Sequence, residues 1–308
     1  MTKIQNTKRL EFLSQRKAIN IVQKEDPQYP KSLADIVDAP KQLYHKGQWN
    51  LEIFDKCLAV VGTRKMTSYG KRITEQIVGE VAAAGVTIVS GFMYGIDAEA
   101  HKAALNAGGK TIAVMPCGID VICPEYQVDL HKEILHNKGL VISEYEGTHP
   151  AFLWTFPKRN RIIAGLAKAT LVVEAAENSG ALITAKFAKK YGRKIFAVPG
   201  PLTSAVSQGV TQLLKEGATV VSGANDILEY YDIFRSSPKS DLGKTKSDLG
   251  KIEGALEQKI VKELKKEAME IYILARKLEI PAAKLGAAIS MLQLEGHIGE
   301  EQGKLYVI

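Results

Sequence analysis

The sequence predicts an α/β protein built on an extended Rossmann-type sheet that is doubly wound and mostly parallel. Between residues 51 and 234, short apolar segments alternate with amphipathic ones. The apolar segments are nearly continuous runs, which is typical of strands that helices cover on both faces of a sheet. The pattern stops after residue 234, and the 308 residues are enough for one large domain and a second, small one.

The individual elements follow from the length and periodicity of each segment. We expect strands in the apolar runs, at residues 57–61, 86–89, 111–115, 140–142, 170–173, 194–198 and 219–221. We expect helices in the amphipathic stretches between them, at residues 69–84, 98–107, 126–136, 181–190 and 210–216.

The segments that flank this Rossmann-like domain, residues 51–234, differ from it in composition. Residues 1–50 combine a basic arm with three X-Pro steps, which favour extended backbone, so we expect a lead-in rather than a domain. Residues 235–254 contain the polar sequence SDLGK twice, at 240–244 and 247–251, and predict a flexible basic linker.

Residues 255–308 predict a small winged-helix-like domain, because three helix-like stretches precede a short hairpin. A helix that reads the major groove presents Lys, Arg, Asn or Gln to the bases. The third stretch, residues 281–296, offers only Lys284 and Gln293 for this purpose. We therefore expect this domain to make a protein contact and not to recognise duplex DNA.

The net charge of +7 indicates an anionic partner, but most of the charge lies outside the large domain. Residues 1–50 carry +4 and residues 235–251 carry +3, whereas residues 51–234 carry only +1. An anion site in the large domain must therefore be a local cluster of cations.

The sequence also indicates a cellular compartment. No apolar run approaches the roughly 20 residues of a membrane span, and residues 1–17 lack the apolar core of a signal peptide. The cysteines, Cys57, Cys117 and Cys123, form no CxxC pair. We expect a cytoplasmic protein with reduced cysteines and no membrane contact.

Two loops that follow predicted strands have the composition of phosphate-binding turns. The first loop contains Gly62, Arg64, Lys65 and Ser68, and the second contains Ser179, Gly180 and Thr184 at the start of a helix. Glycine lets a ligand approach the backbone, and a helix N-terminus attracts anions, although each glycine alone also has a structural explanation. Because the carboxyl ends of parallel strands share one edge of a sheet, we expect both loops at one site.

The densest basic cluster consists of Lys158, Arg159 and Arg161, with Asn160 among them and Phe156 just before them. Cations neutralise phosphates, and aromatic faces stack on unpaired bases. The alternative is a solvated run of charges. The apolar residues at 162–164 follow directly and fix the cluster to the core, so we predict a contact with nucleic acid or phosphate.

Other motifs do not support a cofactor or a catalytic centre. The sequence GKT at 109–111 leaves a helix and enters a strand, opposite to the order in a P-loop, and GxGxxG is absent after the first strand. Asp97 and His101 are four residues apart and can face each other on a helix. We expect them to form a structural pair, with Asp97 capping its helix, rather than a metal or catalytic site.

The order of these motifs resembles the DNA-processing protein A (DprA/Smf) family over about residues 26–230. The matching strings are VGTR at 61–64, SYG at 68–70, SG at 90–91, GIDAEAH at 95–101, CGID at 117–120, FPKRNRIIAGL at 156–166, SGALITA at 179–185 and VPGP at 198–201. The family commonly carries Ala-Arg where this chain has Met93 and Tyr94, and a basic residue where it has Leu153.

This resemblance implies an extended Rossmann fold that binds single-stranded DNA in a basic pocket without catalysis or a cofactor. It also implies a homodimer that protects single strands and loads RecA recombinase during transformation or recombination. DNA-contact roles carry over to the matched positions Arg64, Phe156, Lys158, Arg159 and Arg161.

Two alternatives stay open from the sequence. The arrangement of glycine loops over a parallel sheet is similar to that of nucleoside-monophosphate phosphoribohydrolases, although their PGGxGTxxE signature is missing here. Glu174 and Asp97 would be the acids of such an enzyme. A nucleotide-sensing regulator without turnover is the second alternative.

Overall fold

The structure is a computed structural model that describes residues 20–233, 254–301 and 303–307. Its elements are β1 (Asn20–Gln23), α2 (Lys31–Ala34), β2 (Gln42–Lys46), η1 (Leu51–Phe54), β3 (Cys57–Val61), α3 (Ser68–Ala83), β4 (Thr87–Ser90), α4 (Ile96–Asn106), β5 (Thr111–Gly118), η2 (Glu125–Gln127), α5 (Val128–His136), β6 (Leu140–Tyr145), α6 (Thr155–Leu166), β7 (Ala169–Val172), α7 (Gly180–Lys190), β8 (Lys194–Ala197), η3 (Ala205–Ser207), α8 (Gln208–Lys215), β9 (Thr219–Val220), α9 (Ala224–Tyr230), α10 (Ala255–Leu264), α11 (Ile271–Leu278), α12 (Ala282–Leu294), β10 (Ile298–Glu301) and β11 (Lys304–Val307). The chain divides into two compact units, Met1–Arg235 and Ser236–Ile308.

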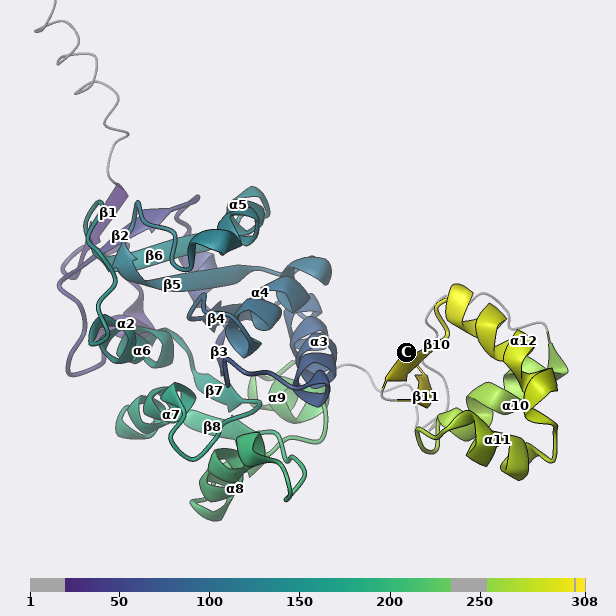
Figure 1. The fold of residues 1–308 in the computed structure, drawn as a ribbon. Helices are drawn as coiled ribbons and strands as arrows, with labels where there is room; N and C mark the ends of the chain where they lie inside the picture. Colours follow the sequence, from purple (N-terminus) through teal and green to yellow (C-terminus); the bar gives the residue numbers. More distant parts are fainter. Residues whose placement is uncertain (1–19, 234–253, 302, 308) are drawn as a thin grey trace, which may run out of the picture. The chain divides into compact units, whose positions relative to one another are not determined.

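The first unit is built on one mostly parallel sheet, as predicted (Figure 1). Among the described residues the sheet has nine strands in the order β1-β2-β6-β5-β4-β3-β7-β8-β9. The chain starts the parallel part at β3, adds β4, β5 and β6 on one side, and then returns to add β7, β8 and β9 on the other. In such sheets ligands bind where the strand order reverses, beyond the carboxyl ends of the strands.

Helices cover both faces of this sheet, and β3 shows how the sequence arranges them. Cys57, Ala59 and Val61 belong to the core that packs against α6, α7 and α8. Leu58 and Val60 belong to the core that packs against α3, α4 and α9. Successive side chains of a strand point to opposite faces, so a strand between two helical layers is apolar throughout. This confirms the doubly wound architecture.

The lead-in differs from the prediction. β1 pairs with β2, and β2 pairs antiparallel with β6, so residues 20–46 extend the sheet and belong to the same unit. The X-Pro steps predicted extended backbone correctly, but they carry no information about a partner strand more than 90 residues away, as with Tyr44 and Ser143. The predicted boundary at residue 50 therefore does not separate two bodies. The predicted basic arm and the linker up to residue 253 lie outside the described residues.

A second difference from the prediction is the helix α6, because no helix was expected in this part of the sequence. Pro157 lies in its first turn, where a helix tolerates proline because the first N–H groups have no partner within the helix. Ile162, Ile163 and Leu166 anchor the helix in the core. The basic cluster therefore lies on a helix, which directs neighbouring side chains to different sides.

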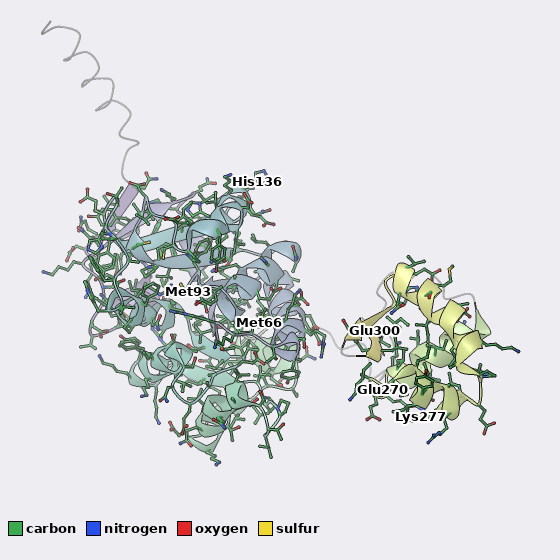
Figure 2. All side chains as sticks on the ribbon, in the orientation of Figure 1. Met66, Met93, His136, Glu270, Lys277 and Glu300 are labelled. Atoms are coloured by element: carbon green, nitrogen blue, oxygen red, sulfur yellow. The ribbon has the colours of Figure 1, made fainter. Side chains whose placement is uncertain are left out.

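The second unit contains α10, α11 and α12, followed by the antiparallel pair of β10 and β11. The order of elements is the predicted one, and the winged-helix assignment itself stays a prediction. The unit has its own core, to which Ile260, Leu274, Leu285 and Leu305 contribute. Charged residues such as Glu270, Lys277 and Glu300 lie at its surface (Figure 2).

None of the helices in the described ranges combines the length and the apolar character that crossing a membrane requires.

Candidate functional site

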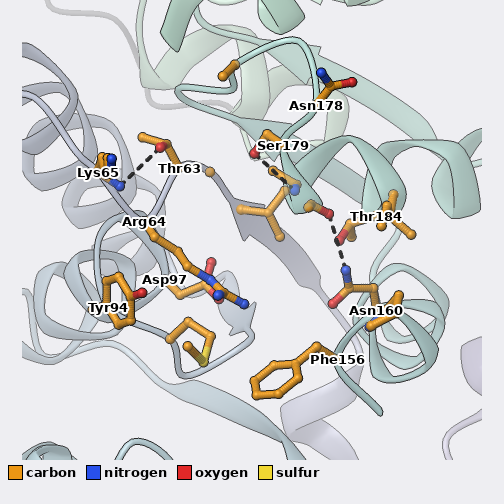
Figure 3. A pocket seen from close by; sticks show the side chains of 18 of the residues that line it. Thr63, Arg64, Lys65, Tyr94, Asp97, Phe156, Asn160, Asn178, Ser179 and Thr184 are labelled. Atoms are coloured by element: carbon orange, nitrogen blue, oxygen red, sulfur yellow. Dashed lines mark hydrogen bonds between the residues drawn. The ribbon is translucent and has the colours of Figure 1, made fainter. Parts of the chain in front are cut away.

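A cavity of about 790 Å³ lies beyond the carboxyl ends of β3 and β7, where the strand order reverses (Figure 3). Its walls come from the loop after β3, the loop before α4, the start of α6 and the start of α7. Of the twelve predicted binding residues, all of which the structure describes, nine line this cavity: Gly62, Arg64, Lys65, Phe156, Arg159, Asn160, Ser179, Gly180 and Thr184.

Close backbone packing fixes the position of the loop that carries Arg64. A Cβ atom on Gly62 would lie 2.5 Å from Cγ1 of Ile96, so no side chain fits there. Gly95 has a φ of +80°, and a Cβ atom on it would lie 2.3 Å from the carbonyl oxygen of Thr63. The two loops are joined where the Ile96 N–H donates to the Thr63 carbonyl at 3.2 Å. Glycine at both positions permits this close approach.

Arg64 projects over the cavity between two aromatic rings (Figure 3). Its Cζ atom lies 5.7 Å from the ring centroid of Tyr94 and 5.5 Å from that of Phe156. Ring faces attract a guanidinium at such distances and hold it in place. Arg64 is exposed, so its charge is accessible to an anion in the cavity.

The opposite wall is the N-terminus of α7. The Ser179 hydroxyl caps this helix by accepting from the N–H of Ala181 at 3.3 Å, and Asn160 Nδ2 donates to the carbonyl of Gly180 at 3.3 Å (Figure 3). Thr184 lies one turn further along the helix. A helix N-terminus favours negative charge. The cavity therefore has a cationic wall and a polar wall that both suit a phosphate group.

Arg159 has a different environment from the one predicted. It reaches the cavity, but it is only 4% exposed, and its Nη1 donates to the carbonyl oxygens of Gly91 and Val114. Burial lowers its pKa to about 10, so it stays charged at neutral pH. Arg159 thus ties α6 to the loop after β4 and to the middle of β5, whereas the sequence predicts a direct phosphate contact.

Lys158, Arg161 and Ser68 are not among the residues that line the cavity. Arg161 Nη2 lies 2.5 Å from Glu144 Oε1, and Lys158 Nζ lies 3.3 Å from Glu144 Oε2. Residues three apart on a helix share a face. The two cations therefore meet Glu144 at the end of β6. Because these cations are adjacent in the sequence, a single cluster was expected. The helix instead directs Arg159 to the cavity and Lys158 and Arg161 to Glu144.

Glu174 supports the start of α3. It is buried, and its carboxylate accepts from the backbone N–H of Thr67 at 3.0 Å and from the Thr67 hydroxyl at 2.5 Å. Thr67 in turn caps α3 by accepting from the N–H of Gly70. Glu174 does not line the cavity. The first acid of the alternative enzyme is therefore engaged in a helix cap.

The expected pair of Asp97 and His101 does not form, and the residue at the N-cap of α4 is Gly95 rather than Asp97. His101 Nδ1 lies 2.7 Å from the Thr111 hydroxyl, which itself donates to the carbonyl of Ile88. Burial lowers the pKa of His101 to about 3, so this histidine is neutral. Asp97 lines the cavity instead, and burial raises its pKa to about 6 although the nearby Arg159 opposes the shift.

The cavity wall also contains residues outside the predicted set, among them Met93, Tyr94 and Leu153. These three occupy the positions where the chain departs from the motifs of the family that it resembles. Met93 is buried in the interior, whereas His136 lies at the surface (Figure 2). The departures were the only sign in the sequence that these positions face the site.

Within residues 20–233, 254–301 and 303–307, the side chains of His, Cys, Asp and Glu form no group of three or more that could hold a metal ion.

The fold and the cavity define a Rossmann-type protein with a cavity at the switch point of its sheet, lined by an exposed arginine and a helix N-terminus. A family model for DNA recombination-mediator protein A matches residues 20–232, and the chain belongs to this family. Protein Smf of Escherichia coli is 43% identical over 202 residues, which cover 65% of this chain and 54% of that protein. DNA processing protein DprA of Streptococcus pneumoniae is 41% identical over 207 residues, which cover 67% of this chain and 72% of that protein. The chain thus spans only about half the length of the E. coli relative.

Solved structures of DNA processing protein A are also similar to this chain. The X-ray structure of DprA from Streptococcus pneumoniae is similar with a TM-score of 0.65 and 37% identity, over 72% of this chain and 77% of that chain. DNA processing protein A from Helicobacter pylori, whose structure describes a unique single-stranded DNA binding mode, has a TM-score of 0.62 and 30% identity, over 70% of this chain and 99% of that chain.

Proposed function

We propose that this chain binds single-stranded DNA in the cavity between the loop after β3 and the start of α7. One observation carries the proposal. Arg64 is an exposed cation held between the rings of Tyr94 and Phe156, and it lines the same cavity as the N-terminus of α7. A phosphate between Arg64 and the helix start would be neutralised from both sides. The adjacent rings offer stacking faces to bases.

The preference for single strands follows from the aromatic rings. Bases of a duplex are stacked on each other and paired, so they cannot lie against the Phe156 or Tyr94 ring. Stacking of unpaired bases on aromatic side chains is worth about 1–3 kcal/mol per base and tolerates any sequence. Binding should therefore be specific for single strands, independent of sequence and sensitive to salt.

The proposal extends to recombination. Membership of the recombination-mediator family supports a role in which the chain, as a homodimer in the cytoplasm, protects single-stranded DNA and loads RecA recombinase onto it. The test is RecA filament assembly on single-stranded DNA coated with single-strand-binding protein. Faster assembly with the wild-type chain, but not with Arg64→Ala, is expected. Equal rates with and without the chain would contradict this role.

We also propose that the chain is not an enzyme and uses no cofactor. The engagement of Glu174 in the cap of α3 supports this, because the phosphoribohydrolase alternative needs a free acid beside the nucleotide. Incubation with nucleoside monophosphates at high protein concentration should release no free base. Turnover that is lost in Asp97→Asn would establish the enzyme instead.

The binding proposal is tested by fluorescence anisotropy of a labelled oligothymidine and of its duplex, with the wild type and Phe156→Ala. We expect tighter binding of the single strand, and a loss of about tenfold in the variant, since each 1.4 kcal/mol of lost stacking changes the Kd tenfold. Tyr272→Ala, which removes an exposed ring from the second unit, is the control. Equal affinity for both DNA forms would mean that the cavity takes a smaller anion.

A further inference from the structure

A second aromatic surface lies beside the cavity, on the other side of the start of α6. Four rings contact each other in a closed cycle, and we refer to them as the aromatic quartet: Tyr145, His149, Phe152 and Trp154. Tyr145 and His149 stack with centroids 4.5 Å apart and planes at 15°, and the planes of Phe152 and Trp154 are within 6° of parallel. Because each ring is held by two others, the surface is ordered before any partner binds.

Two rings of the quartet are exposed to an unusual degree for large apolar side chains, whereas Tyr145 and His149 are half-buried. Phe152 is 45% exposed and Trp154 is 53% exposed, and Leu153 between them is 92% exposed. Single exposed apolar residues are common on protein surfaces, but contiguous ones mark an interaction site. The exposed rings of Phe152 and Trp154 therefore suit a partner whose flat apolar groups can stack on them.

A cation lies on the quartet. Lys158 Nζ is 5.3 Å from the ring centroid of Tyr145 and 5.7 Å from that of Trp154. Glu144 is near this charge, but it also pairs with Arg161, so a single carboxylate is shared by two cations. The surface thus combines ring faces with an exposed cation, which is the combination found where proteins bind single-stranded nucleic acids.

Helical geometry connects the quartet to the cavity. Trp154 and Lys158 are four residues apart at the start of α6 and share one side, whereas Phe156 and Asn160 share the side that faces the cavity. Leu153 lines the cavity, and its sequence neighbours Phe152 and Trp154 belong to the quartet. A strand that leaves the cavity over the start of α6 therefore reaches the quartet directly.

We infer that the aromatic quartet is a second base-stacking site, on which a single strand continues after it leaves the cavity. This inference rests on the proposed function, since it extends the same bound strand. Trp154 and Phe152 stack on bases, and Lys158 neutralises the adjacent phosphate. It assigns Lys158 to DNA binding at this surface rather than in the cavity.

Strand length separates the two sites in an experiment on the full chain. Short and long oligothymidines, of about 4 and about 16 nucleotides, span the site sizes of single-strand-binding folds. We expect Trp154→Ala to weaken binding of the long strand by about tenfold and to leave the short strand unchanged, as expected for the loss of one stacked base. Trp154→Phe should restore most of the affinity, because it restores a ring. Tyr272→Ala should affect neither length.

Tryptophan fluorescence gives an independent readout, because the chain has only two tryptophans, Trp49 and Trp154. The long strand should quench the emission of the wild type more strongly than the short one, and Trp154→Phe should abolish this difference. Trp49 donates to the carbonyl of Gln28 and packs on His45, so its emission provides the internal reference.

Each other outcome overturns the inference. An unchanged long-strand affinity in Trp154→Ala would show that the quartet does not contact DNA, and a changed sedimentation coefficient in that variant would assign it to a protein contact. Equal weakening of both lengths with a lower melting temperature would assign it to folding. If the wild type binds neither strand, or if Arg64→Ala leaves both affinities intact, then the proposed function has failed instead.

Discussion

The guanidinium of Arg159 donates to the backbone carbonyl of Gly91, which ties a helix on one face of the sheet to the loop that follows β4. There is room for this contact only because residue 91 is a glycine, since a Cβ atom there would lie 2.7 Å from Arg159 Nη1. Arg159 lies within the run of cations that the sequence marks for phosphate contact. Its burial instead gives it a part in positioning the site.

Arg159→Ala should therefore reduce stability. It leaves the carbonyls of Gly91 and Val114 without their donor and removes the cation near Asp97. Removing one partner of a buried charged group costs about 3–5 kcal/mol, so the free energy of unfolding in urea should fall by that order. Lys158→Ala, on the exposed side of the same helix, should change it by roughly 1 kcal/mol or less. Equal free energies of unfolding in the two variants would contradict the inference that Arg159 positions the site.

Arg64→Ala should change DNA binding without changing stability. Loss of one phosphate contact lowers the slope of log K against log salt by about one unit, at every sequence alike. Titrations at several salt concentrations measure this slope. Arg64→Lys should recover the slope but not the whole affinity, because lysine lacks the planar group that lies between Tyr94 and Phe156. Lys132→Ala, a remote exposed cation, is the matched control.

The pKa of Asp97 predicts a pH dependence. Burial raises this pKa to about 6, from an ordinary value of about 3.9. As the pH rises through 6, the side chain gains a negative charge in the cavity wall. The affinity for single-stranded DNA should then fall about fivefold between about pH 5 and pH 7, the effect of roughly 1 kcal/mol.

Asp97→Asn should abolish that pH dependence and bind more tightly at neutral pH. The same shift affects folding. Because the folded pKa is the higher one, the contribution of Asp97 to stability is complete below about pH 4 and is lost as the pH rises through 6. Binding curves and urea midpoints across this range check both effects. A variant with the same pH profile as the wild type would show that another group titrates.

Leu153→Lys should strengthen binding. Leu153 lines the cavity and is 92% exposed, so the longer side chain fits without repacking. The added cation should increase the salt slope by about one unit. Val37→Lys is the control, because residue 37 is also exposed and lies next to Asp38, which pairs with Lys190 at the far end of α7. A gain of equal size in both variants would indicate a general effect of net charge.

The second unit leads to a prediction about duplex DNA. The outer side of α12 exposes Met291 and Leu294, and Gln293 Nε2 is 3.5 Å from Glu300. Apolar side chains on this helix fit a protein contact better than a groove. Lys284→Ala should not change the affinity of the full chain for duplex DNA measurably. A clear loss would assign groove recognition to α12.

The sequence by itself determined the parallel sheet, its seven strands from β3 to β9 and nine of the residues around the cavity. These follow from local patterns. An apolar run between amphipathic stretches is buried on both faces, and glycine loops after such strands meet at one edge. The family resemblance carried the same information in motif form.

Only the tertiary structure decided which cations are exposed to a ligand and which are bound to other parts of the protein. Arg64, Lys158, Arg159 and Arg161 look equivalent in the sequence, yet the first is exposed over the cavity and the last two are buried. Because α6 is a helix, neighbouring residues at its start point to different sides. Their partners are distant in the sequence: Glu144 on β6, the carbonyl of Gly91 in the loop after β4, and the carbonyl of Val114 on β5. Long-range partners of this kind leave no periodic trace in the chain. For the same reason the sequence did not reveal the pairing of β2 with β6 or the hydrogen bonds from Thr67, the cap of α3, to Glu174.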